Sequence, residues 1–107
     1  MMGAGLGLST SRTTSGAPVL RVVGEIDRGN SAEFDAAVRA GLDPSAGLLV
    51  VDLSEVVYLD SAGLSVLFAH ADDIEVVVPP LLAPILAISG LDTVIPVRTA
   101  AGSPGTE

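Results

Sequence analysis

The chain of 107 residues contains no cysteine and no lysine, and it has very few aromatic residues. Without cysteine, disulfide bonds, thiolate nucleophiles and the common structural zinc sites are excluded. Phe34, Tyr58 and Phe68 are the only aromatic residues, so we expect an aliphatic core and no aromatic platform on which bases could stack. We therefore expect no metal and no nucleic-acid partner.

Positive charge is also scarce, because five arginines face 13 acidic residues and the formal net charge is -8. Such a surface repels nucleic-acid phosphates and anionic lipids, whereas a basic groove on another protein would attract it. The longest apolar run, residues 76–88, is too short to span a bilayer and contains three prolines. Residues 1–9 lack the features of a signal peptide. We expect a cytoplasmic protein without membrane insertion.

The hydrophobic pattern changes several times between strand-like and helix-like spacing. Residues 6–8 and 19–26 favour an opening hairpin joined by a polar loop over 9–18. Further segments are expected as strands over 48–53, 74–78 and 92–99, and as helices over 30–42, from 61 onwards, and over 80–89. This order predicts an α/β domain, with a small mixed, mostly parallel β-sheet packed against α-helices. We expect disorder in 1–5 and 100–107 around a folded domain over 6–99.

Several local features sharpen these expectations. Asn30 is a candidate N-cap with Glu33 three residues later, a variant of the capping box. The run over 48–53 is typical of a strand buried on both faces. The last helix begins at Pro80 or at Pro84, and Gly90 is placed to cap its end.

Ser61 lies where the strand over 48–53 leads into a helix, a place where open α/β sheets commonly gather ligands and regulators. From spacing alone, Ser61 is a helix N-cap, a role that Asp60 could share. An exposed cap hydroxyl can also accept a phosphoryl group, which the positive end of the helix dipole would tolerate. Ala62 and Gly63 are small enough to let a partner protein come close.

The segment 51–64, Val-Asp-Leu-Ser-Glu-Val-Val-Tyr-Leu-Asp-Ser-Ala-Gly-Leu, resembles the signature of STAS domains, in particular of bacterial anti-sigma-factor antagonists. Gly24–Asp27 and Ser89–Leu91 resemble two weaker landmarks of that family. The similarity extends from Val19 to Val97 and implies the STAS-type fold.

The resemblance also implies a function in transcriptional regulation. Unmodified members bind an anti-sigma factor that is a serine kinase, the kinase phosphorylates the serine that matches Ser61, and a phosphatase reverses the modification. The partner-binding residues would be Asp27, Asn30, Asp60, Ala62, Gly63 and Leu64. The alternative is a STAS-type cytoplasmic adaptor or regulatory subunit of a lipid or anion transporter, without a phosphorylation switch.

Two features depart from the family pattern. Between Gly63 and Ile74 the chain is shorter by roughly one helical turn. Leu81–Ile88 contains no charged residue, although a helix on a sheet normally shows one polar face, so we expect self-association or a hydrophobic partner there.

We expect no catalytic activity and no cofactor. Leu59 stands where a Gly-x-Ser-x-Gly nucleophile motif needs its first glycine. His70 lies nine residues further along the same helix, roughly 13 Å from Ser61, and is interpreted as a solvated helix residue. Asp72 and Asp73 are interpreted as a solvated turn.

Overall fold

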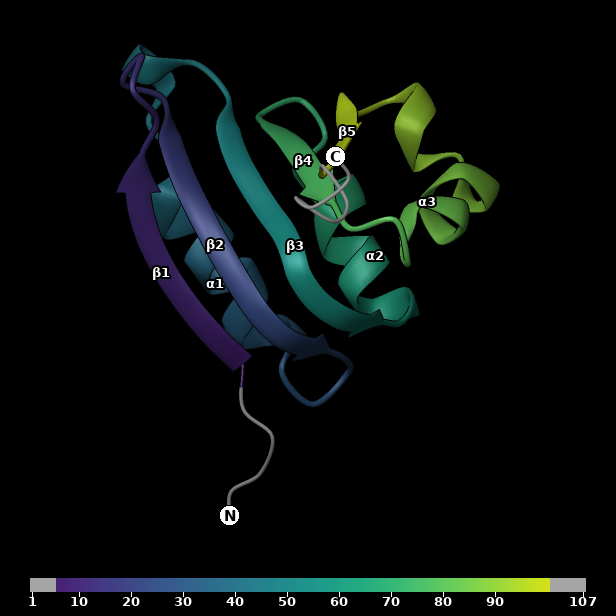
Figure 1. Ribbon diagram of the computed structural model, residues 1–107. Helices are drawn as coiled ribbons and strands as arrows, with labels where there is room; N and C mark the ends of the chain where they lie inside the picture. Colours follow the sequence, from purple (N-terminus) through teal and green to yellow (C-terminus); the bar gives the residue numbers. More distant parts are fainter. Residues whose placement is uncertain (1–5, 101–107) are drawn as a thin grey trace, which may run out of the picture.

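Five strands form one sheet in the computed structural model, which describes residues 6–100. In chain order across the sheet they are β1 (Leu6–Arg12), β2 (Pro18–Ile26), β3 (Leu49–Leu59), β4 (Ile74–Val78) and β5 (Val97–Thr99). β1 is antiparallel to β2, and all other neighbours are parallel (Figure 1). The predicted α/β fold with its opening hairpin is confirmed. Of the segments expected to be disordered, 1–5 and 101–107 lie outside the described residues.

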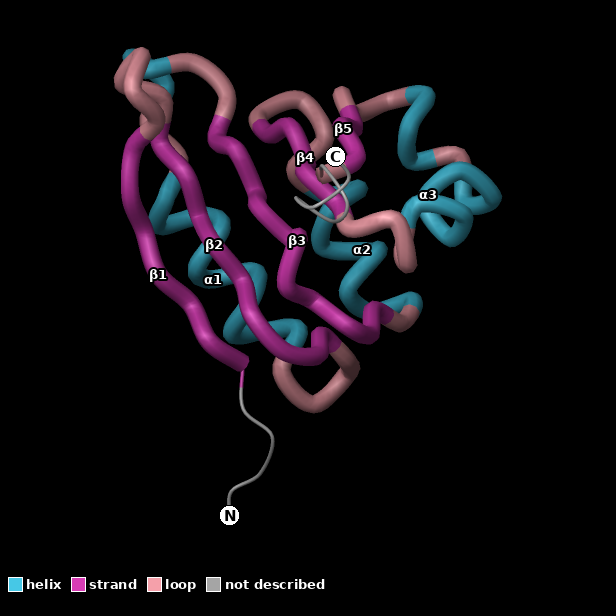
Figure 2. The backbone as a smooth tube through the Cα atoms, viewed as in Figure 1, coloured by secondary structure: helices cyan, strands magenta, loops and turns pink. Residues whose placement is uncertain are grey.

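Three helices follow β2, β3 and β4 in the described part: α1 (Ser31–Gly41), α2 (Ser61–Ala69) and α3 (Ala83–Ser89). Figure 1 shows α1 and α2 side by side behind the sheet, with α3 beyond β4. Short 3-10 helices, η1 (Pro44–Ala46) and η2 (Leu91–Thr93), lie in the loops before β3 and β5 (Figure 2). The core between sheet and helices is aliphatic apart from Phe34, as predicted. None of the helices in residues 6–100 is long and apolar enough to cross a membrane.

β3 extends further than the apolar run predicted, because it continues through a mixed segment to Leu59. Its pairing with β2 contains two register shifts, at each of which β3 carries one residue more than β2. These β-bulges break the simple alternation of buried and exposed residues. The prediction of a strand buried on both faces over 48–53 holds for Leu49–Val51 and Leu53. It is wrong for Leu48, which is 38% exposed and precedes β3, and Asp52 is half-buried.

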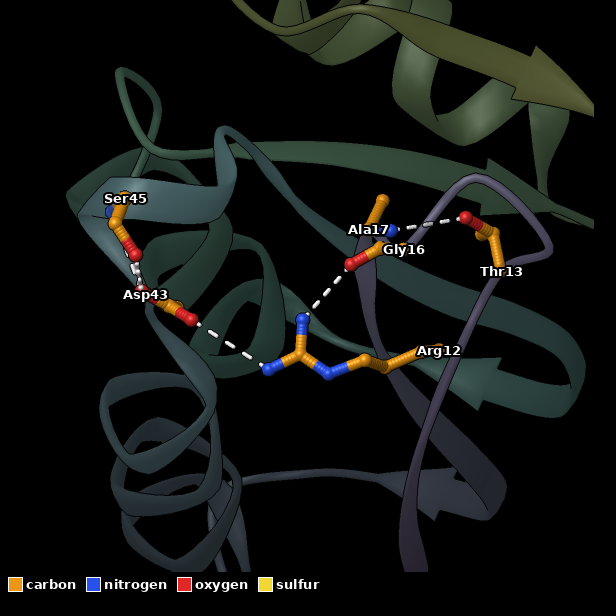
Figure 3. A network of polar contacts seen from close by, with 6 residues as sticks. All are labelled: Arg12, Thr13, Gly16, Ala17, Asp43 and Ser45. Atoms are coloured by element: carbon orange, nitrogen blue, oxygen red, sulfur yellow. Dashed lines mark hydrogen bonds and ion pairs between the residues drawn. The ribbon is translucent and has the colours of Figure 1, made fainter.

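The opening hairpin has a longer first strand than predicted. The polar residues 9–12 were expected in a loop, but they belong to β1 because their backbone groups pair with β2. At the end of β1, Arg12 donates to the carbonyl oxygen of Gly16 at 2.8 Å and forms an ion pair with Asp43 at 3.5 Å (Figure 3). Hydrogen bonds from Ser45, together with Arg12, hold the pKa of Asp43 below its ordinary value. This network joins the hairpin to the end of α1.

His70 links the two helices behind the sheet. It is the C-cap residue of α2, and its Nε2 lies 2.7 Å from Oδ1 of Asp35 in α1. The His70 side chain is only 13% exposed, so the interpretation as a solvated helix residue is wrong. The hydrogen bond from His70, and after it the contact with Arg39, keeps the pKa of Asp35 below its ordinary value.

The C-terminal part follows the prediction with shifted boundaries. α3 begins at Ala83, and Pro84 occupies its first turn, where a missing N–H costs no helical hydrogen bond. Gly90 caps the helix with a left-handed backbone, φ 82°, as expected. The last strand is confined to Val97–Thr99, because residues 91–93 form η2 instead.

Candidate functional site

The loop after β2 and the turn between β3 and α2 meet at one end of the sheet, opposite the hairpin turn (Figure 1). Two hydrogen bonds join them. The backbone N–H of Asp60 donates to the carbonyl oxygen of Ile26 at 3.2 Å, and the N–H of Arg28 donates to Oδ2 of Asp60 at 3.2 Å. The carboxyl ends of β2 and β3 thus bring two segments together that lie more than thirty residues apart in sequence.

Asp60 is the N-cap of α2, and Ser61 is the first helical residue. Oδ1 of Asp60 accepts hydrogen bonds from the N–H groups of Ala62 and Gly63, at 2.9 and 3.2 Å. The prediction that Ser61 caps the helix is therefore wrong. Asp60, which was expected only to share this role, is the residue that caps α2. Ser61 is exposed, and its hydroxyl makes no hydrogen bond within residues 6–100. The hydroxyl is consequently available to another molecule.

Gly63 lies beneath the surface rather than on it. A Cβ at this position would overlap Cδ1 of Leu59 and would lie 2.8 Å from Cγ2 of Ile26. The glycine therefore lets the first turn of α2 pack directly on the ends of β2 and β3. Its small size serves this internal packing, and the structure does not place it on a surface that a partner could reach.

Asp27 and Asn30 shape the loop that faces Asp60. Oδ1 of Asp27 accepts from the N–H of Gly29 at 2.8 Å. Asn30 accepts from the N–H of Asp27 at 2.9 Å and donates to the carbonyl oxygen of Glu25 at 2.8 Å. Asn30 occupies the N-cap position of α1 but makes no capping hydrogen bond, so the predicted capping box is wrong. The side chains of Asp27 and Asn30 thus stabilise the conformation of the loop after β2.

The outer face of α2 begins at Ser61 and continues through residues at helical spacing. Leu64 is half-buried, Ser65 is exposed and Phe68 is 40% exposed. Helical spacing after Ser61 predicts one apolar stripe of Leu64, Leu67, Phe68 and Ala71. Leu67 is fully buried and Leu64 and Ala71 pack against the core, as this stripe predicts, whereas Phe68 is exposed. The buried residues of α2 are Gly63, Val66 and Leu67. Ala62 is half-buried beside Ser61.

Two further apolar residues precede this turn and were not assigned a role from the sequence. Val57 and Tyr58 are 60% and 49% exposed; Val57 is the extra residue of the second bulge of β3, and Tyr58 follows it. Bulges near functional sites commonly re-aim side chains. The end of β3 and the outer face of α2 therefore combine an exposed hydroxyl with exposed apolar side chains, which suits contact with another protein.

The rest of the described surface offers little for small-molecule chemistry near Ser61. No group of three or more His, Asp or Glu side chains within residues 6–100 could hold a metal ion. Two surface depressions, of about 360 and 480 Å³, lie at the hairpin end and are lined by residues such as Arg12, Gly41 and Leu48. His70 is engaged with Asp35, so it is not positioned to activate Ser61.

Comparisons with known proteins agree with this arrangement. A family model described as "Mlab, STAS domain" matches residues 9–97. The crystal structure of an anti-sigma factor antagonist from Mycobacterium paratuberculosis is 29% identical, with a TM-score of 0.78 over 88% of this chain and 86% of that one. No curated protein sequence matches the chain.

Two more distant structures share the fold alone. The anti-sigma factor antagonist SpoIIAA in its unphosphorylated form is 12% identical, with a TM-score of 0.62 over 89% of this chain and 90% of that one. An uncharacterized protein of the DUF3478 family from Shewanella loihica, with a SpoIIAA-like fold, is also 12% identical, with a TM-score of 0.61 over 92% and 88%.

Proposed function

We propose that this chain, which belongs to the STAS domain family, is an anti-sigma-factor antagonist controlled by phosphorylation of Ser61. In its unmodified form it binds an anti-sigma factor with serine kinase activity in a bacterial cytoplasm, and the sigma factor is released to direct transcription. The observation that carries the proposal is the exposed Ser61 hydroxyl, which is left free because Asp60 caps the helix. The 29% identical antagonist structure supports the choice of partner.

The contact surface that we propose consists of the outer face of α2 and the end of β3. Leu64 and Phe68 supply apolar area along the helix, and Val57 and Tyr58 supply more beside it. Each such side chain, once buried, contributes on the order of 1 kcal/mol or more to binding. Asp27 and Asp60 add negative charge, so a kinase with a basic groove would complement this surface.

Phosphorylation would end the contact because it places a bulky, strongly hydrated phosphate on the apolar outer face of α2, and burying that group against the partner costs free energy. The γ-phosphoryl group of ATP passes to Oγ of Ser61, the hydroxyl loses its proton, and ADP leaves. The phosphate adds nearly two negative charges beside Asp60 on a chain whose net charge is already -8. A phosphatase that hydrolyses the ester would restore the binding form.

The test is a kinase assay in which Ser65 serves as an internal control. Ser65 is also exposed and lies one turn further along α2. The chain is incubated with candidate anti-sigma kinases and ATP, and its intact mass is measured. We expect one added phosphoryl group on the natural chain and on Ser65→Ala, and none on Ser61→Ala. Phosphorylation that persists in Ser61→Ala, or neither binding nor modification with any candidate, would overturn the proposal.

A second candidate function is a static adaptor, such as the regulatory subunit of a lipid or anion transporter. The α3 surface, which consists of Leu81 just before the helix and of Ile85 and Ile88 within it, favours this function. Leu81 is 65% and Ile88 is 87% exposed, and residues 79–91 carry no charge. Binding to a protein partner that leaves the mass of the chain unchanged in the presence of ATP would favour this function.

We also propose that the α3 surface mediates self-association. Two copies with a net charge of -8 repel each other over most of their surfaces. Leu81, Ile85 and Ile88 form a charge-free surface where two copies could meet without burying an unpaired charge. A second copy of the chain is therefore the partner that this surface fits best.

A further inference from the structure

Arg28 forms no ion pair with an acidic side chain of residues 6–100, and its backbone N–H donates to the carboxylate of Asp60, the residue before Ser61. Of the five positively charged residues, three form ion pairs with carboxylates: Arg12 with Asp43, Arg21 with Glu55, and Arg39 with Asp35. Arg28 and Arg98 form none within residues 6–100. On a chain with a net charge of -8, we expect most guanidinium groups to pair with carboxylates. Arg28 is unpaired within residues 6–100 and is anchored next to the turn that carries Ser61.

The backbone of Arg28 is tied to the turn that carries Ser61. Its N–H donates to Oδ2 of Asp60, while Oδ1 of the same carboxylate accepts from the N–H groups of Ala62 and Gly63. One side chain thus connects residue 28 to the first turn of α2, where Ser61 is the first helical residue. The position of Arg28 relative to Ser61 is set by three hydrogen bonds.

The neighbouring carboxylates are already engaged with backbone donors. Oδ1 of Asp27 accepts from the N–H of Gly29 at 2.8 Å, and both oxygens of Asp60 accept backbone hydrogen bonds. The exposed Arg28 side chain pairs with neither of them. Asp27 and Asp60 would repel a phosphate on Ser61, so Arg28 is the positive group at this end of the sheet that could balance it.

We propose that Arg28 forms an intramolecular ion pair with the phosphate of phosphorylated Ser61. This inference rests on the proposed function, in which Ser61 is modified. A guanidinium binds a phosphate dianion with two parallel hydrogen bonds, which gives a defined geometry as well as attraction. The ion pair with Arg28 fixes the phosphate at the start of α2, where it covers part of the contact surface that the unmodified protein presents to its partner. Arg28 therefore positions the phosphate in the modified protein. Its side chain is not needed for the fold of the unmodified protein, because the hydrogen bond to Asp60 uses the backbone of residue 28.

The ion pair can be measured without a kinase. Phosphoserine is incorporated at position 61 during translation of the full chain, and the phosphate is titrated by ³¹P NMR. The natural chain is compared with Arg28→Gln and with Arg98→Gln, which removes the other unpaired arginine. Since the bond to Asp60 uses the backbone of residue 28, unmodified Arg28→Gln should unfold at the same temperature as the natural chain.

A nearby guanidinium stabilises the dianion and therefore lowers the second pKa of phosphoserine, which is ordinarily about 6. We expect this pKa to rise by about 0.5 unit or more in Arg28→Gln and to stay unchanged in Arg98→Gln. Equal values in all three proteins would overturn the ion pair, because the helix dipole would then account for any shift. A failed kinase assay would overturn the proposed function but would not alter this titration, so the two failures are distinguishable.

Discussion

Replacing Gly63 by alanine should destabilise the protein, although alanine is the better helix former. The added Cβ would overlap Cδ1 of Leu59 and would lie 2.8 Å from Cγ2 of Ile26. Both side chains are buried, with 4% and 0% exposure, and the branched Ile26 side chain has little rotamer freedom. Overpacking of this kind costs about 1–3 kcal/mol, whereas the change from glycine to alanine regains at most about 1 kcal/mol in a helix. The expected net loss is about 1–2 kcal/mol.

Urea unfolding followed by circular dichroism measures this loss, and each kcal/mol also lowers the melting temperature by about 4–8 °C. Ser65→Gly compared with Ser65→Ala gives the helix-propensity difference at an exposed position of the same helix. Leu59→Val removes the Cδ1 atom that the new Cβ would meet, so Gly63→Ala should cost less in that background. A Gly63→Ala protein as stable as the natural chain, or equally destabilised with and without Leu59→Val, would refute the packing argument.

Three further expectations concern a cap, an ion pair and a surface. Asp60→Ala should lower the free energy of unfolding by about 1–2 kcal/mol in urea, since three backbone N–H groups lose their acceptor, and Asp60→Asn should cost less. Because the folded state lowers the pKa of Asp35, its bond with His70 stabilises the protein above the unfolded-state pKa, about 4, and this contribution is lost as pH falls through the folded-state value. Asp35→Asn should therefore lower the melting temperature near neutral pH and have no effect in strong acid; an equal effect at both would contradict this assignment. In sedimentation equilibrium, the average mass of the natural chain should rise with concentration while that of Ile88→Ser should not, and identical behaviour would exclude α3 as the interface.

The fold could be predicted from the sequence because local signals and topology agree over most of the chain. β-branched residues indicated β2, helical spacing indicated α1, and the order of the elements required a mostly parallel sheet. The polar half of β1 could not be recognised, because it lies at an edge of the sheet and its order depends on pairing with β2. The extension of β3 to Leu59 could not be recognised either, because two bulges interrupt the alternation of buried and exposed residues along the strand.

At the candidate site, the position of Ser61 could be predicted but not the division of roles around it. Serine and aspartate are both good N-caps, so the sequence does not decide between Asp60 and Ser61. In the structure Asp60 is the cap, and its second oxygen also accepts from the backbone of Arg28, thirty-two positions away in sequence, which no local pattern could indicate. The burial of Gly63 and the bond between His70 and Asp35 also depend on segments distant in sequence.

This division of roles determines what a modification at Ser61 could change. If Ser61 were the cap, a phosphate on its hydroxyl would replace the group that holds the first turn of α2, and phosphorylation would act on the fold. Because Asp60 holds that turn through Ala62 and Gly63, the Ser61 hydroxyl can be modified while the capping hydrogen bonds remain. The helix dipole would offset part of the added charge, on the order of 1 kcal/mol. The effect of the phosphate would therefore fall on the outer surface of α2, where a bound partner would meet it.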